Sequence, residues 1–251
     1  MLNDKQLQRY SRQVLMSDFD VVGQEKLCEA TVLVVGLGGL GCPAALYLAA
    51  AGVGRLLLAD GDEVELSNLQ RQIAHQESDI GRNKACSAAD AVTAVNSDVC
   101  VEVLDRQLEE NDLPELVAAV DLVVDASDNY PIRYALNRAC IGAMVPLVSA
   151  AAVRGEGQIS VFDPTRSGPC YRCLYPDDSS DTALSCSQSG VLAPVVGVFG
   201  SLLAMEAIKV LADYGECLRG SLLLVDFKTM DVRKLILPRR NNCPDCAHLH
   251  C

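Results

Sequence analysis

Three glycines form a Gly-x-Gly-x-x-Gly motif at Gly36, Gly38 and Gly41. The motif lies between an apolar segment and an alanine-rich one, the strand–turn–helix context in which it binds nucleotides. Glycine permits a tight turn and close approach of phosphate to the helix amino end, where free N–H groups favour negative charge. Asp60 ends the next apolar segment, near where a carboxylate would bind ribose hydroxyls. An NAD site would show the same pattern, and a glycine turn that only packs helix on strand is the alternative to nucleotide binding.

Two cations favour ATP over NAD. The segment after Asp60 contains Ser67, Asn68, Leu69, Gln70 and Arg71, and Lys84 lies farther on, at the start of a predicted helix. A triphosphate carries roughly four negative charges, which fixed arginine and lysine side chains offset well. Each cation taken alone is better explained as a solvated surface charge, and only its placement beside the glycine-rich turn favours a contact with phosphate.

Acidic residues follow a third apolar segment. Asp125, Asp128 and Asn129 stand at its carboxyl end, the edge at which open α/β sheets bind ligands. A carboxylate there could hold Mg²⁺ that bridges phosphates, because magnesium prefers one or two carboxylates with phosphate and water. Alternatively, Asp128 could cap a helix that begins near Pro131.

Four cysteines in two Cys-x-x-Cys pairs indicate a metal site. The pairs are Cys170 with Cys173 and Cys243 with Cys246, and Zn²⁺ takes four thiolates tetrahedrally in structural sites. Such a site would tie the carboxyl-terminal tail to the body of the domain. The alternatives are a redox pair or ligation by tail residues, which are His248, His250 and Cys251.

Cys186 stands apart from these pairs. It lies in a polar segment, residues 177–190, that we expect to form a mobile loop. Free cysteines are usually buried, so a thiol in such a loop is a candidate nucleophile or sulfur acceptor.

The elements that position these residues alternate as in a doubly wound sheet. The pattern predicts a helical segment at 1–28 and a nucleotide-binding half at 29–150, with strands near 31–35, 55–60, 99–104, 121–129 and 145–151. Helices are expected at 82–95, 112–120 and 134–143. In residues 151–246 the pattern predicts antiparallel strands and a helix over 193–214. The fold class is therefore α/β, a Rossmann-like parallel half that continues into an antiparallel half within one domain.

Composition excludes several classes of function. The chain has 251 residues and a net charge of −12, whereas binding of duplex nucleic acid needs a basic surface. Its apolar runs are shorter than the 18 to 20 residues, roughly, of a membrane span. The polar start MLNDKQLQRY does not resemble a secretory signal, so we expect a cytoplasmic protein with reduced thiols. Six single cysteines are expected to be small buried side chains, namely Cys28, Cys42, Cys86, Cys100, Cys140 and Cys217.

The motifs together resemble those of the MoeB/ThiF/HesA adenylyltransferases, bacterial relatives of ubiquitin-activating enzymes. They are VLVVGLGGLGCPAALYLAAAGVG, LADGDEVELSNLQRQI, DASDN, PCYRCLYP and CPDC, in the family order. The resemblance implies a ThiF-type fold and ATP-dependent adenylylation of the carboxyl-terminal glycine of a small ubiquitin-like sulfur carrier ending in Gly-Gly, with release of pyrophosphate.

The resemblance also implies roles for single residues. Gly39 would line the nucleotide, Asp60 would bind ribose, Asn68, Arg71 and Lys84 would contact phosphates, and Asp128 would hold Mg²⁺ and serve catalysis. Arg12 matches an arginine that reaches the phosphates of the neighbouring subunit, which implies a homodimer.

Within the family, the segment AAAVRGEGQISVF resembles the MoeB branch, which serves molybdopterin synthesis through a MoaD-like carrier. ThiF-type activation of the thiamine carrier ThiS is the alternative. No rhodanese domain follows Cys246, so we expect a separate protein to donate sulfur. Two other classes stay open: an NAD(P)-dependent oxidoreductase, which leaves Arg71 and Lys84 without a role, and a scaffold that binds a carrier without activating it.

Overall fold

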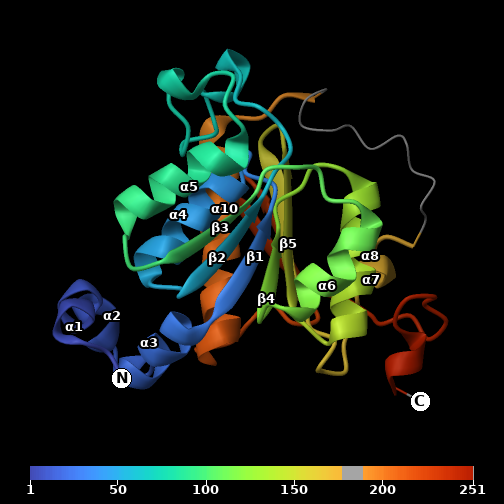
Figure 1. Cartoon of the computed structure of the whole chain (residues 1–251). Coiled ribbons are helices and arrows are strands. Elements are labelled where there is room, and N and C mark those ends of the chain that lie inside the picture. Colours follow the sequence, from blue (N-terminus) through green and yellow to red (C-terminus); the bar gives the residue numbers. More distant parts are fainter. Residues whose placement is uncertain (177–188, 251) are drawn as a thin grey trace.

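The computed structural model describes residues 1–176 and 189–250, which form an eight-stranded sheet covered by helices on both faces (Figure 1). The strand order is β3-β2-β1-β4-β5-β6-β7-β8. The strands are β1 (Thr31–Val35), β2 (Arg55–Ala59), β3 (Cys100–Leu104), β4 (Leu122–Asp125), β5 (Leu147–Val153), β6 (Glu156–Phe162), β7 (Ser221–Asp226) and β8 (Asp231–Ile236).

The first five strands are parallel and the last three are antiparallel to their neighbours. Val34 of β1 pairs with Leu58 of β2 and Val124 of β4, while β5 pairs with β6 from Leu147↔Phe162 to Val153↔Glu156. The predicted α/β class and the change from parallel to antiparallel pairing are therefore confirmed. The hairpin between β5 and β6 turns at Arg154, whose φ of 55° lies in the left-handed region.

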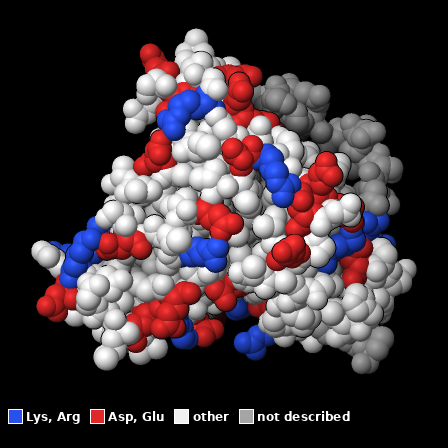
Figure 2. Space-filling view, in the orientation of Figure 1, with Lys and Arg blue, Asp and Glu red and all other residues white. Residues whose placement is uncertain are grey.

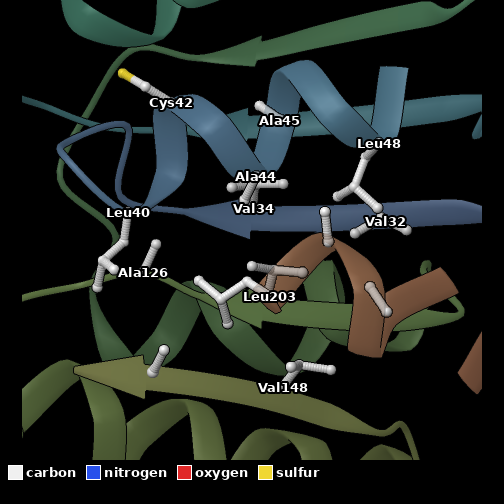
Figure 3. Close-up of a cluster of buried hydrophobic side chains, with 14 of the residues drawn as sticks. Val32, Val34, Leu40, Cys42, Ala44, Ala45, Leu48, Ala126, Val148 and Leu203 are labelled. Atoms are coloured by element: carbon white, nitrogen blue, oxygen red, sulfur yellow. The ribbon is translucent and has the colours of Figure 1, made fainter. Parts of the chain in front are cut away.

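Helices divide between the two faces (Figure 1). One face is covered by α4 (Gly41–Ala51), α5 (Lys84–Val95) and α10 (Ala193–Ala212), and the other by α6 (Leu113–Ala118), α7 (Tyr130–Ala143) and α8 (Tyr171–Leu174). Side chains of a strand alternate between faces, so Val32 and Val34 of β1 join one core cluster and Leu33 joins the other. Figure 3 shows Val32 and Val34 between the side chains of α4 and Leu203 of α10.

The helix α10 is the one described helix that is long and apolar enough to cross a membrane by length and composition alone. It packs against α4, β5 and β6, and Phe199 and Leu203 are fully buried there. Those contacts explain its apolar composition as that of a core helix.

The remaining elements are short. At the amino terminus lie α1 (Asp4–Arg9), α2 (Ser11–Val14) and α3 (Asp20–Glu29), which confirm the predicted helical segment; four 3₁₀ turns are Leu66–Asn68, Glu77–Asp79, Glu110–Asp112 and Ala247–His250. The helix α7 begins at Tyr130, four residues before the predicted start at Tyr134, because Asn129 caps it.

The predicted burial of the six single cysteines is right only in part. Cys42 and Cys140 are buried, whereas Cys28, Cys86 and Cys217 are half-buried. Cys100 is exposed, which corrects the prediction. The reason is topological, because β3 is the edge strand of the sheet and has no neighbour on its outer side.

Candidate functional site

A cleft of about 870 Å³ lies where β1, β2 and β4 end. Most of the residues predicted for nucleotide binding line it, and these are Gly36, Gly38, Gly39, Asp60, Asn68, Arg71, Lys84, Asp128 and Asn129. Parallel strands bring their carboxyl ends to one edge of the sheet. The topology therefore gathers side chains that lie far apart in the sequence.

The glycine-rich turn has no room for side chains at two of its positions. Gly36 has a φ of +90°, and a Cβ at Gly41 would stand 1.8 Å from the carbonyl oxygen of Gly36. Gly41 is therefore needed for close packing of the turn on α4 and does not line the cleft. At Gly39 a Cβ would meet the side chain of Val196 in α10 at 2.9 Å, whereas Gly38 faces open space apart from Gln72.

Asp60 is fixed beside the turn by backbone donors. Its carboxylate accepts hydrogen bonds from the N–H of Leu37 at 2.7 Å and of Asp62 at 2.9 Å. Burial raises the pKa of Asp60, and the backbone donors oppose that shift. The side chain thus ties the glycine turn to the end of β2, on the wall of the cleft.

The two predicted cations, Lys84 and Arg71, differ in their burial and in their contacts within the chain. Lys84 is 7% exposed, and its Nζ lies 2.8 Å from Oδ2 of Asp62. Arg71 donates from Nη1 to the carbonyl oxygen of Ser67 at 3.1 Å, which leaves most of its guanidinium donors open to a ligand. Both cations line one side of the cleft.

Asp128 does not cap α7. The cap is Asn129, whose Oδ1 accepts a hydrogen bond from the N–H of Ile132 at 3.1 Å. The carboxylate of Asp128 is exposed and lines both the cleft and a second cavity of about 470 Å³. Gly36 and Asp60 also line both cavities, so Asp128 stands at the border between two adjoining spaces.

Asp125 points into the interior and lines neither the cleft nor the second cavity. It is fully buried, and it accepts hydrogen bonds from the hydroxyls of Ser127 and Ser149 at 2.5 and 2.6 Å. Nε of Arg133 lies 3.8 Å from Oδ2 of Asp125. Burial lowers the pKa of Arg133, but Asp125, Tyr171 and Tyr175 together outweigh burial, so the net shift of this pKa is upward. Arg133 also donates to the carbonyl oxygens of Ser127 and Ala150, so this pair holds the turn that presents Asp128.

Four predicted residues lie near the cleft without lining it, and a fifth lies elsewhere. The nearby residues are Gly41, Ser67, Leu69 and Gln70. Arg12 belongs to α2, which lies away from the carboxyl edge of the sheet (Figure 1). Its predicted role concerns a neighbouring subunit and stays a prediction. Cys186 and residues 177–188 of the loop predicted around it lie outside the described residues.

Several residues of the cleft were not predicted. Gln72 is 4% exposed, lines the cleft and has a buried Oε1 without a hydrogen-bond partner in the described chain. Arg133, Arg154 and Gln158 come from α7 and the β5–β6 hairpin. The one usable signal for Arg133 was its position in the first turn of α7, next to the carboxyl end of β4. Nothing in the sequence indicates that the hairpin folds over the cleft.

The two Cys-x-x-Cys pairs meet in space. All four sulfur atoms lie within 4.8 Å of one another, and all four residues are buried. The Sγ atoms of Cys170 and Cys243 are 3.6 Å apart, as are those of Cys173 and Cys246. Tetrahedral Zn–S bonds of about 2.3 Å place sulfur atoms about 3.8 Å apart. The geometry fits a zinc ion with no open coordination position.

His75 lies in a buried chain of hydrogen bonds under the glycine turn. Its Nε2 lies 3.0 Å from the carbonyl oxygen of Leu37, and its Nδ1 lies 2.8 Å from Oγ of Ser87. Ser87 in turn donates to Asp79 at 2.9 Å. Burial lowers the pKa of His75. These contacts give His75 a structural role, and its side chain does not line the cleft.

The face shown in Figure 2 carries basic side chains scattered among acidic ones. No continuous basic surface is seen on this face.

Comparison with known proteins gives three findings. The ThiF family model matches residues 10–245. The chain is 47% identical over 246 residues to molybdopterin-synthase adenylyltransferase of Escherichia coli K12, and 46% identical over 246 residues to the sulfur carrier protein ThiS adenylyltransferase of the same organism. It covers 98% and 97% of those proteins, and each alignment covers 98% of this chain. The crystal structure of E. coli MccB with ATP matches with a TM-score of 0.84 and 27% identity, over 97% of this chain and 75% of that one.

Proposed function

The chain belongs to the ThiF family, and from this premise we propose that it is an adenylyltransferase that uses ATP to activate the carboxyl-terminal glycine of a small ubiquitin-like sulfur carrier. The reaction joins the carboxylate to the α-phosphate and releases pyrophosphate. The observation that carries the proposal is the position of Asp128 at the border of two cavities that share the glycine turn. The second cavity would receive the nucleoside. The cleft, which Asn68, Arg71 and Lys84 line, would receive the triphosphate and the carrier tail.

The residues of the cleft would act by position and charge. Asp60 would accept hydrogen bonds from the ribose, while Asn68, Arg71 and Lys84 would bind the phosphates from one side. Lys84 lies 2.8 Å from Asp62, so its charge is held in place before a phosphate arrives. Fixed donors would offset the charge that develops on the α-phosphate. The reaction needs no protein nucleophile, because the carboxylate of the carrier attacks the α-phosphate directly.

Asp128 is the residue we assign to Mg²⁺ and to catalysis. Its carboxylate is exposed in the cleft and accepts no hydrogen bond from the described residues, which leaves both oxygens available to a hard cation. Magnesium would supply neutralisation of phosphate charge. We assign the four cysteines to structural Zn²⁺, which would join the tail at Cys243 and Cys246 to α8.

For the pathway and partners, we favour molybdopterin synthesis with a MoaD-like carrier. Two relatives of nearly equal identity are named for molybdopterin synthase and for ThiS, so ThiS remains the second candidate carrier. We further propose that the enzyme is a cytoplasmic homodimer in which Arg12 completes the partner's site, that a separate protein donates sulfur, and that Cys186 takes part in sulfur handling.

Carrier-dependent exchange between ATP and labelled pyrophosphate tests this function. Purified enzyme with a MoaD-like or ThiS-like carrier ending in Gly-Gly should exchange label, and Asp128→Ala should abolish exchange without unfolding the chain. Arg12→Ala should also lose exchange, and mixed dimers of Arg12→Ala with Asp128→Ala should recover part of it. Exchange by Asp128→Ala near the normal rate would remove Asp128 from the mechanism, and mixed dimers that form without recovery would exclude a shared arginine.

If the chain were instead an NAD(P)-dependent oxidoreductase, a different nucleotide would stabilise its fold. ATP with Mg²⁺ at about 100 times its dissociation constant should stabilise the fold by roughly 2.7 kcal/mol, whereas NAD should not. Stabilisation by NAD alone would favour the oxidoreductase.

A further inference from the structure

A smaller cavity, of about 290 Å³, lies at the opposite edge of the sheet from the cleft. Its walls come from the turn after β6, the start of β7 and the segment that follows β8. Because Phe162 at the end of β6 pairs with Leu147 at the start of β5, this edge carries the amino ends of the parallel strands. The cavity is therefore remote from the nucleotide cleft, and the proposed adenylylation leaves it without a role.

Three guanidinium groups line this cavity, and they belong to Arg166, Arg219 and Arg239. The single acid among the lining residues is Asp163, whose side chain is 3% exposed and whose Oδ2 accepts from Nε of Arg219 at 2.7 Å. Among the lining residues, three cations face one carboxylate, and Asp213 lies outside the lining but close enough for its charge to act on Arg166 and Arg219. The lining residues alone therefore carry an excess of positive charge, which attracts anions.

The guanidinium donors are only partly used. Arg239 donates from Nη2 to the carbonyl oxygens of Cys246 at 3.3 Å and Ala247 at 3.2 Å, while its buried Nε has no partner. Arg166 makes no side-chain hydrogen bond or ion pair within the described part of the chain, and Arg219 uses only Nε. A buried donor without an acceptor destabilises a fold. An oxyanion in the cavity would provide acceptors for the unused donors of Arg166 and Arg219.

We propose that this cavity binds a phosphate group, either free or carried by a small molecule. Guanidinium forks match phosphate oxygens with paired hydrogen bonds, and three forks around one space exceed what a single carboxylate can accept. Gly168 and Pro169 of the cavity wall directly precede Cys170, and Arg239 contacts the carbonyl of Cys246. A bound phosphate would therefore fix both segments that supply the cysteine cluster.

Nuclear magnetic resonance of backbone amides tests the site locally. Inorganic phosphate or pyrophosphate, titrated at constant ionic strength against chloride, should shift the Gly168 and Gly220 signals with saturation. Arg166→Gln should weaken that binding by roughly tenfold or more, because a hydrogen bond to a charged group is lost. Arg166 has no described partner in the fold, so this variant should stay folded. The matched control is Arg233→Gln, which removes an exposed arginine of β8 that pairs with Asp231.

Signals of Gly36 and Gly38 report the nucleotide cleft separately, so phosphate bound there is not mistaken for this site. Tighter binding of pyrophosphate than of phosphate would assign a diphosphate ligand, and equal affinities would assign a monophosphate. Shifts of Gly168 and Gly220 that grow without saturation, or that Arg166→Gln leaves unchanged, would overturn the proposal.

Discussion

Replacing Asp125 with asparagine should destabilise the fold by about 3 to 5 kcal/mol, the cost of removing one partner from a buried ion pair. Asparagine has nearly the same volume, so no cavity contributes to the loss. What remains is the positive charge of Arg133, whose side chain is 8% exposed and which has no other acid within ion-pair distance among the described residues. For a chain of about 250 residues, a loss of this size lowers the melting temperature by about 6 to 20 °C.

Urea unfolding of the wild type, Asp125→Asn, Arg133→Met and the double variant measures the effect. The double variant should lose less stability than the sum of the single variants, because it leaves no uncompensated charge. Carrier-dependent exchange should fall together with stability, since Arg133 also holds the carbonyl of Ser127 next to Asp128. Additive single effects, or a loss below about 1 kcal/mol for Asp125→Asn, would refute the reasoning.

Three further predictions concern the turn, the cysteines and the histidine. Gly41→Ala should lower stability by more than about 1 kcal/mol and weaken ATP binding, because its Cβ would stand 1.8 Å from the Gly36 oxygen; calorimetry of unfolding and of ATP binding measures both. Cys173→Ser should lower zinc content and melting temperature together, and unchanged zinc per chain would show that the ligand set is wrong. Burial lowers the pKa of His75 below its ordinary 6.5, so the unfolded chain binds the proton more readily. Stability should therefore fall as the pH drops from 6.5 through the folded pKa, and less steeply in His75→Asn; equal slopes in urea unfolding would contradict this.

The order of strands and helices could be predicted because apolar periodicity and glycine punctuation are local signals. The cleft could be predicted where its residues follow strands, since parallel strands end at one edge: Asp60 comes directly after β2, and Asp128 comes three residues after β4. The four-cysteine metal site could be predicted from the spacing within each Cys-x-x-Cys pair, although the pairs of Cys173 and Cys246 lie far apart in the sequence.

The rest depends on contacts that the sequence does not express locally. Asp125 and Asp128 look alike in the sequence, yet one is fully buried against Arg133 and the other is exposed in the cleft. The position of Arg154 depends on how the β5–β6 hairpin folds over the cleft. The positive cavity needs Arg166 and Arg239, which come together only through the antiparallel strands β6 to β8.

The mass of the carrier after incubation with enzyme, ATP and Mg²⁺ tests the central claim most directly. We predict that a carrier ending in Gly-Gly gains one adenylyl group at its terminal carboxylate and that one pyrophosphate is released for each carrier modified. A carrier of unchanged mass, with no pyrophosphate released by folded enzyme that binds both ATP and the carrier, would contradict the account.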